Sequence, residues 1–152
     1  MTLFQAFLVL CLHFPPTFAA PRQQPCPMPQ VAAASREANI FTPEQAEMLG
    51  GIVMQQVSRE FKLVGDPALN EYLQNIADRM AEVSGVGKVR VAMIDLPELN
   101  AFTFPGARVL LSRKLVSFAR TEDELAGVLA HEFGHIVSRD SERAVSAALS
   151  TP

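Results

Sequence analysis

The sequence predicts an α+β fold that is mainly helical and contains a small β-sheet. Apolar residues recur at three- and four-residue intervals in residues 66–83, and a capped helical pattern covers residues 42–64. Between these segments and a third helix that begins near residue 121, apolar and polar residues alternate one by one, as in half-buried strands. A chain of 152 residues is long enough for one domain with a core.

The charge of the chain excludes two classes of partner. The net charge is -3, and lysine and arginine form no run. Proteins that bind nucleic acid or an anionic membrane surface carry a basic patch, because the phosphate charge must be neutralised. We therefore expect neither partner.

The first 19 residues are predicted to be a signal peptide. Residues 3–14 are an apolar run without Asp, Glu, Lys or Arg, shorter than the ~20 residues that span a bilayer. Thr17 and Ala19 suit the small positions of a signal peptidase site, although no Lys or Arg precedes the run. We expect export to the periplasm or cell envelope, with no stable membrane span after cleavage. The alternatives are a buried helix and a misassigned start codon.

Residues 20–41 are predicted to be a linker. Four prolines fall within residues 21–29, and proline removes backbone donors and favours extended conformers. Cys11 would leave with the signal peptide, so Cys26 would have no intramolecular partner. No intramolecular disulfide is expected, and an intermolecular bridge through Cys26 is the alternative.

Two capped helices should open the folded part. Thr42 is a natural N-cap with Pro43 at the first helical position, and Asp66 and Pro67 repeat this signal. The Gly50-Gly51 pair should weaken the first helix in its middle. The second helix has a core-facing stripe that consists of Leu69, Tyr72, Leu73, Ile76, Ala77, Met80 and Val83.

A small sheet should follow. Residues 88–95 alternate, with Val89, Val91 and Met93 on one side. Residues 101–104 and 108–112 are two further extended pieces around a Pro-Gly turn, which predicts a hairpin or a bulged edge. A short helix is expected near residues 114–119.

The final helix should begin with a capping box. The Thr121 hydroxyl can bond the amide of Glu124, while the Glu124 carboxylate reaches back to the amide of Thr121. From residue 125 the helix is apolar nearly all round, so we expect it to be buried. Gly127 and Gly134 would let a neighbouring element approach closely.

This helix carries the sequence VLAHEFGHIVSRD. His131 and His135 are one helical turn apart, about 6 Å along the axis, so both imidazoles can reach one ion. Glu132 is rotated so that its carboxylate misses the ion but meets a water beside it, where a general base belongs. Zinc suits this set, and the predicted reaction is hydrolysis of a peptide bond.

A non-catalytic interpretation stays open. Two buried histidines and a glutamate can satisfy one another in a core. With three histidines in the whole chain, chance explains the His-Glu-x-x-His spacing poorly. The alternative is a catalytically inactive, truncated homologue that acts as a binding or structural module.

Upstream of this helix, ELNAFTFPGARVLLSRKLV precedes TEDELAGVLAHEFGHIVSRD. Together they resemble zinc metallopeptidases of the HtpX and BepA type, a family that also includes the CAAX prenyl endopeptidases. The resemblance covers residues 42–148 and implies a zincin-like fold, one zinc ion per chain, and misassembled envelope proteins as substrates, with envelope assembly partners. The implied site residues are His131 and His135 as zinc ligands, Glu132 as catalytic base, and Asn100, Ala101 and Phe102 on a substrate-binding edge strand.

The chain departs from that family in two places. Asp140 stands where the family usually has histidine after Arg139. The third ligand of such enzymes, a glutamate from a downstream helix, is not found, so residues 42–152 are interpreted as the N-terminal part of a peptidase domain, truncated at its C-terminal side. On a continuous helix Glu142 and Glu124 lie about 16 Å and 10 Å from the histidines, and Asp140 lies about 140° round from His135. None should reach, so we expect weak zinc binding and little hydrolysis by the 152 residues.

Overall fold

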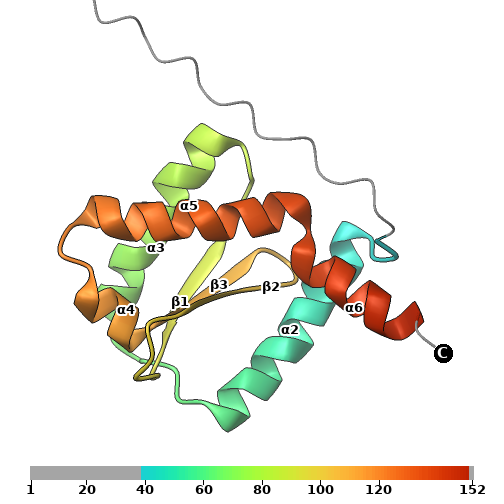
Figure 1. The fold of residues 1–152 in the computed structure, drawn as a ribbon, viewed down its shortest axis with the longest axis horizontal. Helices are drawn as coiled ribbons and strands as arrows, with labels where there is room; N and C mark the ends of the chain where they lie inside the picture. Colours follow the sequence, from blue (N-terminus) through green and yellow to red (C-terminus); the bar gives the residue numbers. More distant parts are fainter. Residues whose placement is uncertain (1–38, 151–152) are drawn as a thin grey trace, which may run out of the picture. The chain divides into compact units, whose positions relative to one another are not determined.

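The computed structural model describes residues 39–150. The predicted signal peptide and nearly all of the predicted linker lie outside these residues. The elements, shown in Figure 1, are α2 (Pro43–Glu60), α3 (Pro67–Ser84), β1 (Arg90–Ile94), β2 (Ala101–Phe104), β3 (Arg108–Ser112), α4 (Arg113–Phe118), α5 (Glu122–Ser138) and α6 (Asp140–Ser150). The fold is mainly helical with one small sheet, which confirms the predicted α+β class. Within residues 39–150 no helix combines the length and apolar character needed to cross a bilayer.

The sheet has the order β1-β3-β2. β2 and β3 form the predicted hairpin, antiparallel with Ala101 opposite Leu111. β1 pairs with the other side of β3 in parallel, with Val91 opposite Val109. Gly106 takes a φ of 71° in the hairpin turn, a conformation that glycine adopts without steric cost. Because β2 stands at the end of the order β1-β3-β2, it is an edge strand.

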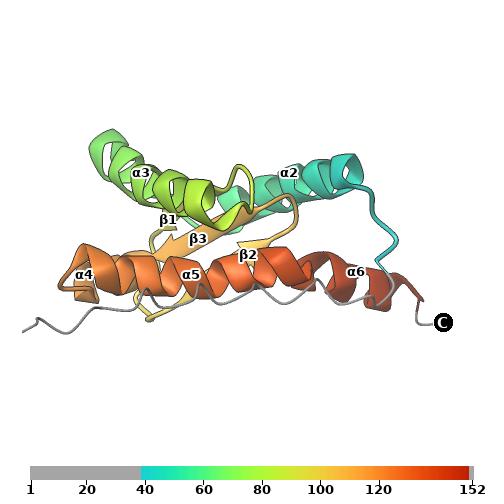
Figure 2. The same ribbon diagram turned by 90° about the horizontal axis from the view of Figure 1, so that it is seen from above.

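One face of the sheet is covered by α3 and α5. Figure 2 shows β1 beside α3 and β2 beside α5. The predicted inward side of β1 is confirmed, because Val89, Val91 and Met93 are buried. Full burial of each large apolar side chain contributes about 1.5–3 kcal/mol, so this core fixes α5 against the sheet. The core consists of Leu73, Ile76, Ala77, Val89, Val91, Met93, Val109, Leu111, Leu125, Leu129 and Phe133.

Two predictions about the first helices are wrong. The predicted stripe on α3 is too wide, since Tyr72 and Val83 are 41% and 73% exposed at its margins. α2 ends at Glu60 and not near residue 64. The chain after it becomes extended, and the amide of Val64 donates to the carbonyl of Met93 at 2.8 Å. Pairing with β1 therefore ends the helix.

α2 is held against the hairpin turn. Its N-terminus is capped as predicted by Thr42, whose hydroxyl accepts from the amide of Gln45 at 3.2 Å. Gly50 is buried, and a Cβ there would collide with the carbonyl oxygen of Pro105. Gly51 has no atom within 4 Å of such a Cβ among the described residues. Gly50 therefore allows α2 to lie close to the hairpin turn.

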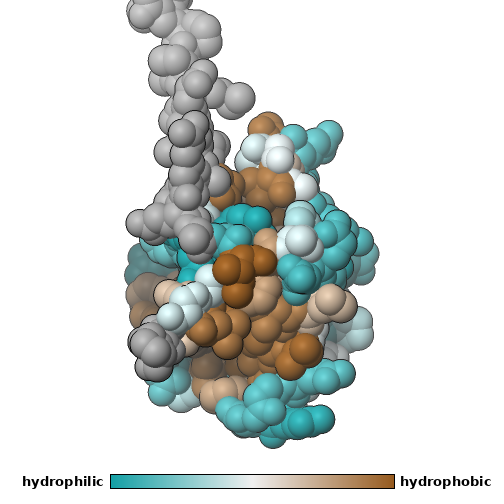
Figure 3. Space-filling model, turned by 90° about the vertical axis from the view of Figure 1, so that its right-hand side faces the viewer, coloured by the Kyte–Doolittle hydropathy of each residue, from teal (hydrophilic) through white to brown (hydrophobic). Residues whose placement is uncertain are grey.

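The outer side of α2 is apolar and exposed. Met48 and Ile52 on α2 are 63% and 65% exposed, and Ile40, just before the helix, is 56% exposed. Figure 3 shows a hydrophobic area on the side of the molecule that carries α2 and α6. A shallow groove there is lined by Ile40, Phe41, Gln45, Met48, Leu49 and Ile52.

α5 differs from its prediction in two details. Thr121 accepts from the amide of Glu124 at 3.2 Å, but the Glu124 carboxylate accepts from the amide of Arg120, at 2.7 Å, instead of that of Thr121. The helix is buried on one side only, because the sheet and α3 lie on that side. Gly127 and Gly134 are exposed, and no described atom lies within 4 Å of a Cβ built at either. The prediction that these two glycines allow a neighbouring element to approach closely is therefore wrong for the described residues.

Candidate active site

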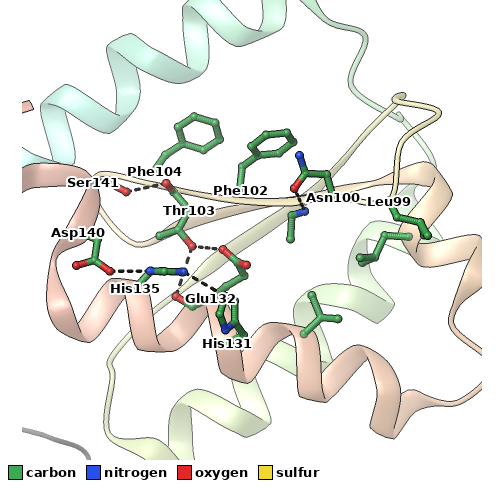
Figure 4. Close-up of a pocket in the computed structure, with 13 residues that line it drawn as sticks. Leu99, Asn100, Phe102, Thr103, Phe104, His131, Glu132, His135, Asp140 and Ser141 are labelled. Carbon is green, nitrogen blue, oxygen red and sulfur yellow. Dashed lines mark hydrogen bonds and ion pairs between the residues drawn. The ribbon is translucent and has the colours of Figure 1, made fainter. Parts of the chain in front are cut away.

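A cleft lies between the edge strand β2 and helix α5 (Figure 4). β2 and the residues before it form one wall, and α5 with the start of α6 forms the other. All six predicted site residues line it. The full lining is Leu99, Asn100, Ala101, Phe102, Thr103, Phe104, Leu115, Val128, His131, Glu132, His135, Asp140 and Ser141.

The two histidines converge as their spacing predicted. The Nε2 atoms of His131 and His135 are 3.2 Å apart, and the rings stand at 90° with their centres 4.8 Å apart. Zinc binds imidazole nitrogen at about 2.0–2.1 Å, so two ligands of one tetrahedral ion lie about 3.3 Å apart. The observed separation fits two ligands of one zinc ion.

Glu132 is turned from the histidines toward β2. Its residue is 5% exposed, and its carboxylate needs a partner because an unpaired buried carboxylate is costly. The Thr103 hydroxyl donates to Oε2 of Glu132 at 2.5 Å. Sequence reasoning did not single out Thr103. Its alternation with Phe102 and Phe104 is the only signal that it faces α5.

Asp140 contacts His135, contrary to the expectation that it faces elsewhere. Nδ1 of His135 and Oδ2 of Asp140 are 2.6 Å apart, and the other carboxylate oxygen accepts from Arg143. The prediction assumed a continuous helix, but Arg139 adopts a left-handed φ of 53° and separates α5 from α6. The His135 hydrogen bond, with the charge of Arg143, lowers the pKa of Asp140.

The predicted strand residues line the cleft in different ways. The Asn100 side chain accepts from the amide of Ala101 at 2.9 Å and so braces the start of β2. Phe102 lines the cleft, but its ring stacks with that of Phe104 at 6.3 Å and points away from Glu132 (Figure 4). Its side chain is not brought to the histidines.

The backbone of β2 presents peptide groups at its open edge. In an antiparallel pair, residues alternate between bonding the partner strand and pointing their N–H and C=O groups away. The amide of Ser112 donates to the carbonyl of Asn100 at 2.9 Å. The alternation therefore directs the peptide groups of Ala101 and Thr103 outward. The Ser141 hydroxyl, also missed from the sequence, donates to the carbonyl of Thr103 at 2.7 Å.

No third protein ligand joins the histidines within residues 39–150, because no group of three His, Cys, Asp or Glu there is arranged to hold an ion. Glu142 is buried on α6, where it accepts from the amide of Gly106 at 3.4 Å. Asp140 has both oxygens engaged elsewhere. The described residues supply two candidate ligands.

An edge strand beside a helix with the His-Glu-x-x-His motif is the arrangement of a metallopeptidase. Comparison with known sequences agrees, since the pattern of Peptidase family M48 matches residues 67–152. The chain belongs to this family.

Three relatives illustrate the range of the family. Over 66% of its own length, the chain is 31% identical to the Beta-barrel assembly-enhancing protease of Escherichia coli. It is 41% identical to Protease HtpX homolog 1 of Saccharolobus solfataricus over 47%, and 34% identical to Mitochondrial metalloendopeptidase OMA1 of Schizosaccharomyces pombe over 49%. It spans only 21%, 24% and 23% of these three proteins.

Proposed function

We propose that the cleft is the site of a zinc-dependent endopeptidase. His131 and His135 hold one zinc ion, and Glu132 is the general base. The observation that carries the proposal is the 3.2 Å separation of the two Nε2 atoms beside a buried glutamate that faces an open sheet edge. The remaining positions around the ion are left to water and to groups outside residues 39–150.

The protein side chains have separate tasks in this reaction. Zinc, when bound, acts as a Lewis acid and lowers the pKa of water toward about 7. Glu132 accepts a proton from the attacking water and delivers it to the amine that leaves. Thr103 occupies only one carboxylate oxygen of Glu132, so the other oxygen is left to face the water.

The substrate is an extended polypeptide that pairs with β2. Main-chain pairing to an edge strand reads backbone shape and tolerates varied sequences. The outward carbonyl of Ala101 and the outward amide of Thr103 provide this edge. The other two outward groups already bond the Asn100 side chain and the Ser141 hydroxyl. Asn100 keeps the start of the strand in place. Phe102 lies between the two outward-facing residues, but its ring faces away and its own peptide groups pair with β3, so its part is to hold the strand extended.

Exported or misassembled envelope proteins are the proposed substrate class, with the periplasm or cell envelope as the location and envelope assembly partners beside it. Two observations support this class. The first residues have the composition of a signal peptide, and the E. coli relative is named for enhancement of β-barrel assembly. Membership of a peptidase family favours this function over the binding-module alternative.

The test is hydrolysis of fluorescently labelled casein by the purified protein with added zinc. We expect slow cleavage, because the described residues supply only two candidate zinc ligands. Glu132→Gln should remove this cleavage while the added zinc stays bound, because the amide cannot accept the proton. Glu98 is an exposed acid in the segment between β1 and β2, and Glu98→Gln is the matched control that keeps the activity. A Glu132→Gln variant as active as the wild type would overturn the assignment of the base. Zinc-loaded protein without any cleavage would favour the binding-module alternative.

A further inference from the structure

The imidazole of His135 uses both of its nitrogens. Nε2 faces Nε2 of His131 at 3.2 Å, and Nδ1 faces the Asp140 carboxylate at 2.6 Å. A neutral imidazole carries its proton on one nitrogen and its lone pair on the other. The carboxylate accepts a hydrogen bond from the N–H at Nδ1, which leaves the lone pair on Nε2, toward His131.

The turn at Arg139, between α5 and α6, brings Asp140 to His135. On a continuous helix Asp140 would point about 140° away from His135. Arg139 interrupts the helix with a φ of 53°, and Asp140 becomes the first residue of α6. A non-glycine residue pays a steric cost in this conformation, so the surrounding structure must hold it there.

Two arginines stabilise the turn between α5 and α6. The Arg139 guanidinium donates to the carbonyl of Phe41 at 3.1 Å, which ties the turn to the segment before α2. Arg143, one turn along α6, donates to the second oxygen of Asp140. The carboxylate is therefore fixed from both sides, with one oxygen left for the imidazole.

We propose that Asp140 is a positioning residue of the metal centre. It fixes the ring orientation and tautomer of His135, so that Nε2 is available to zinc, and it makes the ring a stronger donor. Asp140 acts through His135 and does not bind the ion, because it lies across the ring from Nε2 (Figure 4). This assignment rests on the proposed function, because it requires zinc at His131 and His135.

The experiment is zinc affinity by competition with a chromophoric chelator, on the purified full chain. Asp140→Ala should weaken zinc binding about 10- to 100-fold, the usual effect of removing such a partner. Asp140→Asn should stay within about threefold of the wild type, because its amide oxygen still accepts from Nδ1. Asp123→Ala is the matched control: it removes an exposed acid from the first turn of α5, about 18 Å from His135, and should leave the affinity unchanged.

The outcomes separate this assignment from the proposed function. Equal zinc affinity in Asp140→Ala and the wild type would overturn the role of Asp140 and leave the metal centre standing. A wild-type chain that binds no zinc would overturn both. An equal loss of zinc affinity in Asp140→Ala and Asp140→Asn would also overturn the role of Asp140, because the hydrogen bond to His135 would then not be the cause of the loss.

A second measurement does not depend on a variant that folds. The ring-nitrogen chemical shifts of His135 in the zinc-free wild-type protein report its tautomer. We expect the proton on Nδ1. A proton on Nε2 would overturn the assignment.

Discussion

The Thr103 hydroxyl donates to the Glu132 carboxylate at 2.5 Å, across the cleft from strand β2 to helix α5. This bond joins the strand that would pair with a substrate to the residue that would move the proton. A buried carboxylate with a single fixed donor keeps one orientation, because the alternative rotamers would leave it unpaired.

Thr103→Val tests this link with nearly unchanged volume. We expect kcat to fall about tenfold, as when other supporting hydrogen bonds of a catalytic site are removed, while KM changes by less than about twofold because the substrate edge is intact. Thr103→Ser keeps the hydroxyl and should retain most of kcat. Steady-state hydrolysis of a labelled peptide measures both constants. A serine variant as slow as the valine variant would speak against the hydrogen bond.

Gly50→Ala and Gly51→Ala are a matched pair on α2. A methyl group at Gly50 meets the Pro105 carbonyl, whereas Gly51 has open space. We expect Gly50→Ala to lower the free energy of unfolding by about 1–3 kcal/mol, and Gly51→Ala to raise it by up to about 1 kcal/mol. Urea denaturation measures both. Shifts of the same sign would contradict the close approach of α2 to the hairpin turn.

Glu47 connects α2 to the sheet with an acid-sensitive bond. The Arg90 hydrogen bond, with that of Arg108, lowers the pKa of Glu47. A carboxyl with a lowered folded pKa stabilises the fold above its unfolded pKa of about 4.3, and this contribution is lost as the pH falls through the folded pKa. Glu47 is 46% exposed, so solvent screening limits the effect to about 1 kcal/mol or less.

Glu47→Gln should therefore reduce the free energy of unfolding at pH 7 and cost less near pH 3, because the stabilisation by the wild-type carboxylate falls as the pH drops below about 4.3 toward its lowered folded pKa. Arg90→Gln removes the same hydrogen bond from the other partner and should show the same pH dependence. Urea denaturation at the two pH values is the measurement. An equal cost of Glu47→Gln at both would mean that packing, and not charge, is responsible.

Local signals predicted the positions of the elements. Thr42 and Asp66 cap their helices as expected, since a cap depends on residues within one turn. His131 and His135 converge because helical geometry alone sets their spacing. The alternation of β1 also depends on neighbouring residues, and its inward side chains are buried.

Local sequence patterns could not predict contacts between residues far apart in the chain. The contact between Asp140 and His135 depends on a left-handed turn at Arg139, and no glycine marks it. Thr103 meets Glu132 only because the sheet places β2 beside α5. The early end of α2 follows from pairing of residues 63–64 with β1, which no helical pattern predicts.

The zinc K-edge X-ray absorption spectrum of the purified protein, loaded with one equivalent of zinc, tests whether His131 and His135 hold the ion. We expect two imidazole ligands with Zn–N distances of about 2.0–2.1 Å, and loss of both in the His131→Ala/His135→Ala double variant. A folded wild-type protein whose bound zinc shows no histidine in its coordination shell would contradict it.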